Sequence, residues 1–490
     1  MYEQYIKRKW CDRLIKSFIK NSAIYTISTV LTRGISIFLI PIYTLYLTPS
    51  EYGLIDYFMI LASIINLTIA LEISQAVARY YQEAKGRQEK KEYVSTAFLF
   101  TLVIYLAYYI ISYVFSNNFS ELFLDDTSLE VLFIIASAAI ATNGIFYFVQ
   151  NQLKFEIRPK DFAVVSIVNV IILAIVAIYL LTILGLKVES IFIAQIIANI
   201  IASVLAIYLA RQSYEFKFNY GKFKEMISFS YPLVLSGIAV FIAMFIDRIA
   251  IKQILGFEEL GIYGLAYRFA AISGLVMIGF QSSLMPLVYK HYKEKNTPKD
   301  ISKIFNIFSL FALVVVAGSI VFSKEMIVLL TTEVFYGAAS IVSILVIATF
   351  FSNMYIFAPG IGIAKKTKLI AVITIFGAIV NTILNYTLIP IFGLSGAAYA
   401  TLISAILVFG LYVKLGYKYY PIPYKTKELI LSFIFILLSG SFVLNIFDTI
   451  TLLSVSVKIV YVLVVLVAVS YMLLEKKDME KIKFFKKKEI

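Results

Sequence analysis

Residues 162–183 read FAVVSIVNVIILAIVAIYLLTI, which is 22 residues without a charged side chain. As a helix this run is about 33 Å long, enough to cross the hydrocarbon core of a bilayer. Comparable runs recur along the 490-residue chain, of which 61% is hydrophobic and 15% charged. Polar side chains are too few to cover a soluble fold, and the runs do not alternate as the strands of a membrane β-barrel do. We therefore predict an all-α integral membrane protein.

The apolar runs predict fourteen transmembrane segments joined by short connections. These segments are 20–42, 53–75, 94–115, 129–151, 161–183, 188–210, 227–251, 262–288, 304–323, 339–359, 369–390, 394–415, 428–446 and 453–475. The first six form a predicted N-terminal lobe, 20–210, and the next six form a C-terminal lobe, 227–415. The last two, within 428–475, lie outside both lobes. Basic segments at 1–19 and 476–490 complete the chain.

The 44 Lys and Arg residues are distributed unevenly between the two predicted sides of the membrane. Seven of them fall within the membrane or on the side away from the termini, and the other 37 lie on the side that holds both termini. The seven are Arg33, Lys187, Arg248, Lys252, Arg268, Lys324 and Lys458. Because cytoplasmic loops carry the excess of Lys and Arg, we expect both termini to be cytoplasmic and the protein to lie in the cell membrane. The net charge of +14 then indicates orientation rather than nucleic-acid binding.

The chain contains a weak internal repeat with a spacing of 208 residues. This shift places Gly53 on Gly261 and Gly185 on Gly393, and it gives ten identities over the 50 positions from 53 to 102. It also carries segments 1–6 onto segments 7–12. Because each copy has an even number of segments, both have the same orientation, which predicts a pseudo-twofold axis along the membrane normal.

Several short motifs resemble those of a known family. They are LTPSEYG at 47–53, SQAVARYY at 74–81, Tyr231-Pro232, Ile246-Asp247-Arg248, Leu260-Gly261-Ile262-Tyr263 and Ala266-Tyr267. In this order and spacing they resemble the polysaccharide flippases, which share a superfamily with multidrug and toxic-compound extruders and with lipid II flippases. The resemblance implies two six-helix lobes around a central cavity that opens to each side in turn. It also implies a groove for a lipid tail at the last two helices.

The arginines near or within the predicted membrane segments are candidates for binding the substrate. A flippase must move a polyprenyl pyrophosphate headgroup through the membrane, and a guanidinium group matches phosphate oxygens with two parallel hydrogen bonds. Arg33, Arg268, Arg248 and Arg79 are the candidates. The alternatives are an internal ion pair for the first two, a surface-reaching side chain for Arg248 and an orienting charge for Arg79.

A cation site is the second candidate, and it comes from the resemblance to lipid II flippases. Such flippases have a sodium site with an aspartate on segment 7, two polar residues four apart on segment 11 and a threonine on segment 12. Here Asp247, Asn381, Asn385 and Thr401 occupy those places. The i, i+4 spacing puts both asparagines on one helix face. The coupling ion would be sodium or a proton, and the alternative for the asparagines is hydrogen bonding between helices.

No catalytic motif accompanies these candidates, so we do not expect an enzyme. The single histidine, His291, lies in a basic loop beside two tyrosines, and the chain has no phosphate-binding loop ending in Gly-Lys-Ser/Thr. Asp56 and Glu72 in segment 2 are further acidic residues that could pair with an arginine or carry an ion. No resident cofactor is implied.

Three functions remain open from the sequence. The first is a flippase for an oligosaccharide repeat unit on an undecaprenyl-type pyrophosphate, used in surface polysaccharide synthesis. Its partners would be the lipid-linked oligosaccharide and membrane lipids, with a polysaccharide polymerase and glycosyltransferases as candidate protein partners and no nucleic acid. The second is a cation-coupled multidrug exporter of the same superfamily, which predicts an acidic cavity and usually has twelve segments. The third is a membrane sugar polymerase or transferase, which needs a larger outside loop.

The charge distribution makes a testable prediction about topology. In a variant in which Cys11 is replaced by serine, single cysteines placed within 79–91 or 290–303 should resist a membrane-impermeant thiol reagent in whole cells. A cysteine at Gly185, in a predicted outside loop, should react and serves as the control. Rapid labelling of either basic loop would contradict the fourteen-segment topology.

Overall fold

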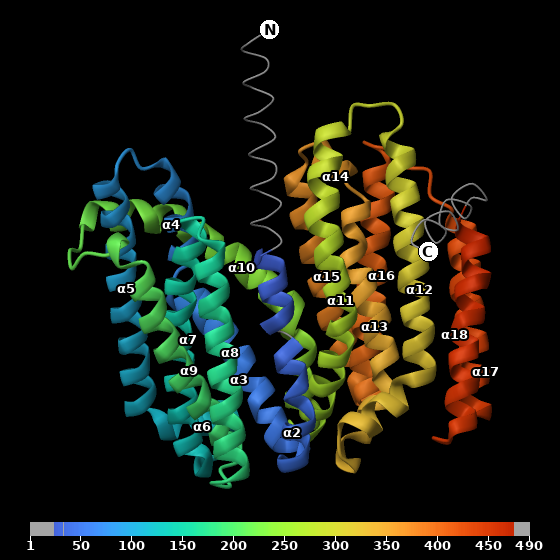
Figure 1. Cartoon of the computed structure of the whole chain (residues 1–490), viewed down its shortest axis with the longest axis horizontal. Helices are drawn as coiled ribbons and strands as arrows, with labels where there is room; N and C mark the ends of the chain where they lie inside the picture. The colour runs from blue at the N-terminus through green and yellow to red at the C-terminus, as the bar shows by residue number, and fades with distance from the viewer. Residues whose placement is uncertain (1–23, 33, 475–490) are drawn as a thin grey trace, which may run out of the picture. The chain divides into compact units, whose positions relative to one another are not determined.

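The computed structural model of the chain describes residues 24–32 and 34–474, and all of the regular structure in these residues is helical. The longer elements and their order are visible in Figure 1. The α-helices are α2 (Ile40–Tyr46), α3 (Pro49–Ile69), α4 (Ile73–Glu83), α5 (Arg87–Val114), α6 (Ser116–Leu124), α7 (Glu130–Phe155), α8 (Pro159–Thr182), α9 (Val188–Leu209), α10 (Tyr220–Leu255), α11 (Phe257–His291), α12 (Thr297–Leu330), α13 (Ala339–Asn353), α14 (Gly360–Ile363), α15 (Thr367–Phe392), α16 (Leu394–Tyr417), α17 (Thr426–Ile446) and α18 (Leu452–Leu473). Short 3₁₀ turns are η1 (Thr127–Leu129), η2 (Arg211–Ser213), η3 (Glu333–Ala338) and η4 (Met354–Phe357).

Thirteen helical segments of the described part of the chain are long and apolar enough to cross a membrane. The prediction of an all-α membrane protein is therefore confirmed. The predicted segment 262–288 corresponds to α11, a continuous helix of 35 residues that is not among the thirteen. Fourteen membrane crossings therefore stay a prediction.

The second predicted segment, 53–75, was wrong as a single helix. The structure ends α3 at Ile69 and begins α4 at Ile73. Between them Leu71 and Glu72 have φ angles of 52° and 50°, a left-handed conformation that is unfavourable for residues with a Cβ atom. Glu72 thus lies at a sharp break and not inside a membrane helix, whereas Asp56 is buried within α3.

The motif at 47–53 has a structural role at the start of α3. The Thr48 hydroxyl accepts a hydrogen bond from the Glu51 N–H at 3.3 Å, and the Glu51 carboxylate accepts one from the Thr48 N–H at 2.8 Å. Pro49 occupies the first turn, where its missing N–H costs nothing. Glu51 also forms a 2.7 Å ion pair with Lys187. The motif therefore fixes the beginning of this helix and ties it to the loop that precedes α9.

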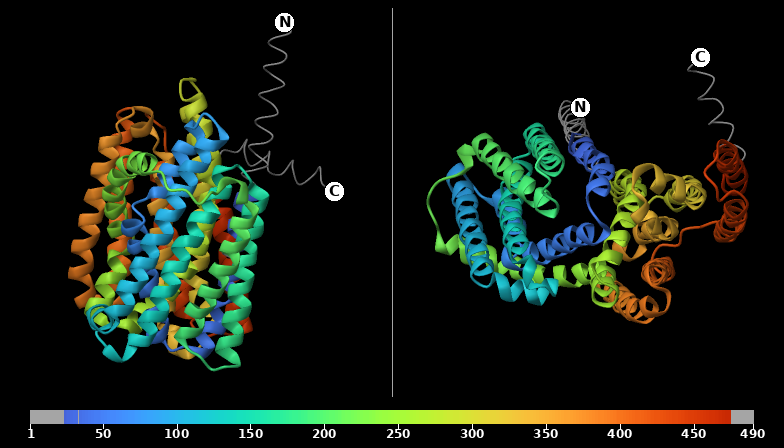
Figure 2. Two further views of the ribbon diagram at one scale, coloured as in Figure 1. Left: turned by 90° about the vertical axis from the view of Figure 1, so that its left-hand side faces the viewer. Right: turned by 90° about the horizontal axis from the view of Figure 1, so that it is seen from below.

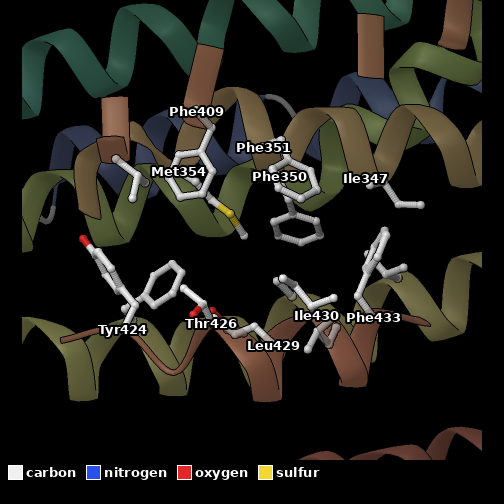
Figure 3. Close-up of a pocket in the computed structure, with 16 residues that line it drawn as sticks. Ile347, Phe350, Phe351, Met354, Phe409, Tyr424, Thr426, Leu429, Ile430 and Phe433 are labelled. Atoms are coloured by element: carbon white, nitrogen blue, oxygen red, sulfur yellow. The ribbon is translucent and has the colours of Figure 1, made fainter. Parts of the chain in front are cut away.

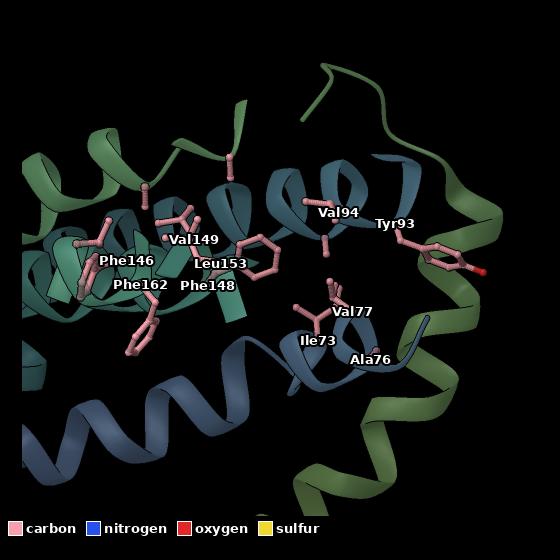
Figure 4. Close-up of a cluster of buried hydrophobic side chains, with 14 of the residues drawn as sticks. Ile73, Ala76, Val77, Tyr93, Val94, Phe146, Phe148, Val149, Leu153 and Phe162 are labelled. Atoms are coloured by element: carbon pink, nitrogen blue, oxygen red, sulfur yellow. The ribbon is translucent and has the colours of Figure 1, made fainter. Parts of the chain in front are cut away.

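The chain divides into two compact units, residues 1–241 and 242–490, and the boundary falls inside α10. The predicted lobe boundary lay earlier, between 210 and 227. In the first unit, α4, α5, α7, α8 and α9 share a buried apolar cluster, part of which is shown in Figure 4. Its residues include Ile73, Val94, Val149 and Leu153, each at most 1% exposed. This cluster packs these helices against one another in the first unit.

Element boundaries recur at the spacing of the sequence repeat. In the first unit α8 begins at Pro159, and in the second α15 begins at Thr367, 208 residues later. The equivalent glycines Gly185 and Gly393 both have positive φ, 66° and 57°, which only glycine adopts easily. α3 and α4 together correspond to the uninterrupted α11. The twofold relation of the lobes itself stays a prediction.

The last two helices, α17 and α18, pack together and against α12 in the second unit, and Figures 1 and 2 show them as a neighbouring pair. Lys458 of α18 is fully buried and forms an ion pair with Glu325 of α12. Lys324, the neighbour of Glu325, pairs with Asp448 at 2.8 Å between exposed side chains. In this surface pair the hydrogen bond from Lys324 lowers the pKa of Asp448. Two ion pairs of very different burial therefore connect α12 to the helical pair.

These two ion pairs predict unequal effects of lysine removal. Lys458→Ala leaves Glu325 buried without its cation and should lower the free energy of unfolding by about 3–5 kcal/mol. Lys324→Ala removes an exposed pair and should cost at most about 1 kcal/mol. Thermal unfolding of the purified protein in detergent measures both. Replacing Lys458 by methionine together with Glu325 by leucine should restore most of the loss, and equal effects of the two single changes would contradict this account.

Candidate functional site

The polar cluster around Asp247 is the most deeply buried group of candidate residues. Asp247 lies on α10 and is 5% exposed. Its Oδ1 atom accepts the backbone N–H of Arg248 at 2.8 Å, and its Oδ2 atom accepts the hydroxyl of Tyr263 on α11 at 2.7 Å. The Tyr263 hydroxyl also lies 3.5 Å from Oγ1 of Thr401 on α16. Tyr263 on α11 therefore connects the candidate aspartate on α10 to the candidate threonine on α16.

Arg248 adjoins Asp247 in sequence, but its guanidinium group stacks on aromatic rings. It lies 4.2 Å from the centre of the Tyr267 ring and 5.5 Å from that of Phe245, and the residue is 7% exposed. A cation over an aromatic face is stabilised by the negative potential of the ring. This stacking holds the Arg248 charge in place beside the cluster.

Asn381 and Asn385 form a hydrogen-bonded pair along one face of α15. The Asn385 Nδ2 group donates to Oδ1 of Asn381 at 2.7 Å and to its backbone oxygen at 2.9 Å. Asn385 is fully buried, and its Oδ1 atom accepts no hydrogen bond from the described residues. The next residue, Tyr386, donates to Oε1 of Gln253 on α10 at 2.5 Å. The side chains at this end of α15 therefore reach α10, and one buried amide oxygen is available for a further partner.

The donor atoms of these four residues suit a hard cation. Carboxylate, amide and hydroxyl oxygens are the ligands that such ions prefer, and an unpartnered buried oxygen is costly unless something binds it. Among the described residues no group of three His, Cys, Asp or Glu could hold a metal ion. The set thus has one carboxylate and three neutral side chains. The structure joins Asp247 to Thr401 through Tyr263 and joins the asparagines to each other.

The candidate phosphate-binding arginines lie in different places. Arg79, on α4, forms a 3.0 Å ion pair with Glu83 and lies 4.7 Å from the ring centre of Phe229, with about half of its side chain exposed. Arg268 is partly buried on α11, one residue after Tyr267. Arg33 lies outside the described residues. Arg248 and Arg268 therefore belong to the second unit and Arg79 to the first.

A separate apolar pocket lies between α17 and the helices α12, α13 and α16. Its volume is about 260 Å³, and Figure 3 shows Phe350, Phe351 and Phe409 on one side opposite Leu429 and Phe433 on the other. The hydroxyl of Tyr424 at one end donates to the backbone oxygen of Phe357. The lining is otherwise almost entirely carbon, so the pocket suits a hydrocarbon ligand.

Two functional features were missed from the sequence alone. Tyr263 belongs to a quoted motif, yet only the structure shows that it joins Asp247 and Thr401. Glu325 was not recognised as the partner of Lys458, because the two residues are 133 positions apart. A buried lysine in a predicted membrane segment is the signal that demands a carboxylate partner.

Comparison with known proteins identifies the family. Residues 45–340, more than half of the chain, match a family described as "Polysaccharide biosynthesis protein". The chain belongs to this family. Over 273 residues it is 24% identical to the succinoglycan biosynthesis transport protein ExoT of Rhizobium meliloti, covering 54% of this chain and 52% of that protein. The resemblance to polysaccharide flippases found in the sequence is thereby confirmed, and the family is one of membrane transporters.

Solved structures share the fold. The lipid II flippase MurJ in an inward closed conformation aligns with a TM-score of 0.69 at 19% identity, over 91% of this chain and 98% of that one. An inward-facing multidrug resistance transporter of the MATE family aligns with a TM-score of 0.61 at 17% identity, over 79% and 94%. At these identities the likeness shows the fold alone. The chain therefore has the fold of this superfamily, in which both flippases and drug exporters occur.

Proposed function

We propose that this protein flips a polyprenyl-pyrophosphate-linked oligosaccharide across the cytoplasmic membrane for the synthesis of a surface polysaccharide. Membership of a polysaccharide biosynthesis family supports the sugar part of the substrate. The similarity to a succinoglycan transport protein supports transport rather than sugar chemistry. The protein carries the substrate by alternating access and leaves glycosyl transfer and polymerisation to partner enzymes.

The apolar pocket at α17 is the observation that carries this proposal. A polyprenyl chain is a long branched hydrocarbon that already lies out of water in the bilayer, so van der Waals packing against the pocket walls would hold it there. Leu429, Ile430 and Phe433 of α17 face a wall of aromatic residues from the body of the second unit. A tail held there keeps the lipid bound while its headgroup moves. The pocket depends on α17, one of the two helices that follow the predicted repeat.

The arginines serve the headgroup in this proposal. A pyrophosphate carries negative charge that must leave water, and Arg33, Arg79, Arg248 and Arg268 supply the compensating positive charge. The stacking of Arg248 on Tyr267 limits its conformations and so lowers the entropic cost of binding phosphate.

A cation at Asp247, Asn381, Asn385 and Thr401 would couple the cycle to an ion gradient. The Asn385 oxygen, which accepts no hydrogen bond from the described residues, and the Asp247 carboxylate support sodium at this place, and a proton is the alternative ion. Binding would draw α10, α15 and α16 together and favour one of the conformations of the second unit. The Tyr263 hydroxyl keeps the carboxylate in position when the ion is absent.

The rival function is cation-coupled export of drugs, and the likeness to the MATE-family fold favours it. An exporter of cationic compounds needs an acidic binding site. The candidate residues here include four arginines, and the apolar pocket involves a helix that follows the predicted repeat. These features suit an anionic lipid better than a soluble cation.

Narrowing the apolar pocket should slow lipid transport selectively. Leu429→Trp fills the pocket, whereas Leu438→Trp places the same ring on an exposed part of α17 and is the control. In proteoliposomes, movement of a labelled undecaprenyl-pyrophosphate oligosaccharide to the outer leaflet should fall about tenfold or more for the first variant only. Equal rates for both variants would remove the pocket from the mechanism. Efflux of a cationic dye without lipid movement would establish the exporter instead.

Removal of the Asp247 carboxylate should abolish the response to sodium. Sodium should raise the unfolding temperature of the purified wild-type protein, and Asp247→Asn should lose that rise because it removes the only carboxylate of the set. Asp448→Asn removes an exposed carboxylate outside the set and should retain the sodium effect, which makes it the control. An unchanged response in Asp247→Asn would eliminate this site, and a pH response without a sodium response would assign the proton.

A further inference from the structure

A second pocket, which is polar and has a volume of about 530 Å³, lies in the first unit. It is formed where α5 begins, where α7 turns into α8, and where α9 ends in η2. Five cations line it, with a single carboxylate, Glu156. The five are Arg87, Lys90, Lys91, Arg158 and Arg211.

Glu156 and Arg158 form an ion pair with each other on one side of the pocket. Glu156 accepts hydrogen bonds from Gln152 at 3.0 Å, from Ser213 at 2.6 Å and from Arg158 at 3.2 Å. Arg158 also donates to Asp161 and to the backbone oxygen of Leu209. Burial would lower the pKa of Arg158, and its hydrogen bonds to the two carboxylates more than offset this and raise it. Because Glu156 pairs with Arg158, it does not neutralise the charges of the other four cations.

The remaining four cations have no carboxylate partner in the described part of the chain. Arg87 donates to the amide oxygen of Gln212 at 2.6 Å, and Arg211 donates to the backbone oxygen of Tyr208. The ammonium of Lys90 lies 4.7 Å from the ring centre of Tyr81. Lys91 completes the set. Like charges gathered in one concave site repel one another, and a bound anion relieves that repulsion.

The level of the pocket along the membrane-spanning helices indicates the source of the anion. Its walls are the ends of three candidate membrane-spanning segments, at Arg87, Phe155 and Leu209. Tyr208, just before the pocket, is 61% exposed, and the Arg211 guanidinium lies 4.7 Å from its ring centre. Exposed tyrosines at the ends of membrane helices mark the level of the lipid headgroups.

The apolar residues that line the pocket adjoin the buried cluster of the first unit. Ala210 belongs to that cluster, and Leu209 and Tyr81 pack against it. Ile157, between Glu156 and Arg158 in the chain, has a φ of 56°, a strained conformation for a β-branched residue. The pocket therefore lies against the packed interior of the first unit.

We propose that this pocket binds the phosphate of one anionic phospholipid headgroup, separately from the transported substrate. The cations contact the phosphate, and the acyl chains lie along the exposed surface beside Tyr208. Basic pockets between membrane helices recognise anionic headgroups in this way. Because the pocket joins α5, α7 and α9, a bound lipid stabilises the first unit as a body. The inference is independent of which substrate the protein translocates.

Native mass spectrometry of the purified full chain tests this inference, with phosphatidylglycerol and phosphatidylcholine as probes. The wild-type protein should retain one phosphatidylglycerol in preference to phosphatidylcholine. The variant R87Q/K91Q/R211Q should bind it about a hundredfold more weakly, since each removed charge contributes roughly a fivefold effect near a membrane surface. The variant K85Q/K160Q/K217Q removes three exposed lysines from the same three connections, outside the pocket, and should change binding by less than about threefold.

The outcomes separate the alternatives. Equal losses in the two triple variants would overturn the pocket in favour of general surface attraction, and equal retention of both lipids would overturn headgroup recognition. Inorganic phosphate is the third probe. If it binds to the wild-type protein and not to the pocket variant while phosphatidylglycerol binding is the same in both, the ligand is a soluble phosphate and the lipid assignment is wrong. Should the triple variant fail to fold, Lys91→Gln alone against Lys85→Gln gives the same comparison.

Discussion

In the hydrocarbon core of a membrane no water can satisfy a peptide N–H or C=O group, so each backbone group must be bonded within the chain. This constraint makes the described part of the protein helical and sets the length of its helices. It acts on side chains as well, because an isolated charge in this medium is very costly. Lys458 is buried only because Glu325 reaches it, and Asp247 is buried with hydrogen bonds to both carboxylate oxygens. Buried polar residues therefore mark the places where helices are tied together.

Two groups of helices in the second unit satisfy this constraint in different ways. At the helices α10, α11 and α16 a carboxylate, a phenol and a hydroxyl form a short chain whose members could rearrange around an ion. At α12 and α18 a buried lysine and a carboxylate form a fixed connection that attaches the last two helices. In the proposed flippase the first arrangement supplies coupling. The second keeps α17 beside the aromatic wall of the apolar pocket, where the lipid tail would lie.

Much of the fold could be predicted because membrane helices are encoded locally. A run of about twenty apolar residues has one way to satisfy its backbone in a bilayer, and an i, i+4 spacing places Asn381 and Asn385 on one face wherever the helix lies. The motif at 47–53 encodes its own helix start through Thr48 and Glu51. The break at Leu71 and Glu72 was not predictable from turn-forming residues, because neither residue is a glycine or proline.

The sequence by itself therefore determined the helical membrane architecture, the candidate arginines and the family, all of which depend on composition, periodicity or contiguous motifs. Only the tertiary structure showed which residues far apart in the sequence contact one another. Tyr263 meets Asp247, Lys458 meets Glu325, and the basic pocket gathers three connections of the first unit. The physical reason is that such contacts depend on how helices pack and where their ends meet. The 3.6-residue period predicts the face of a helix but not the residue that another helix brings to it.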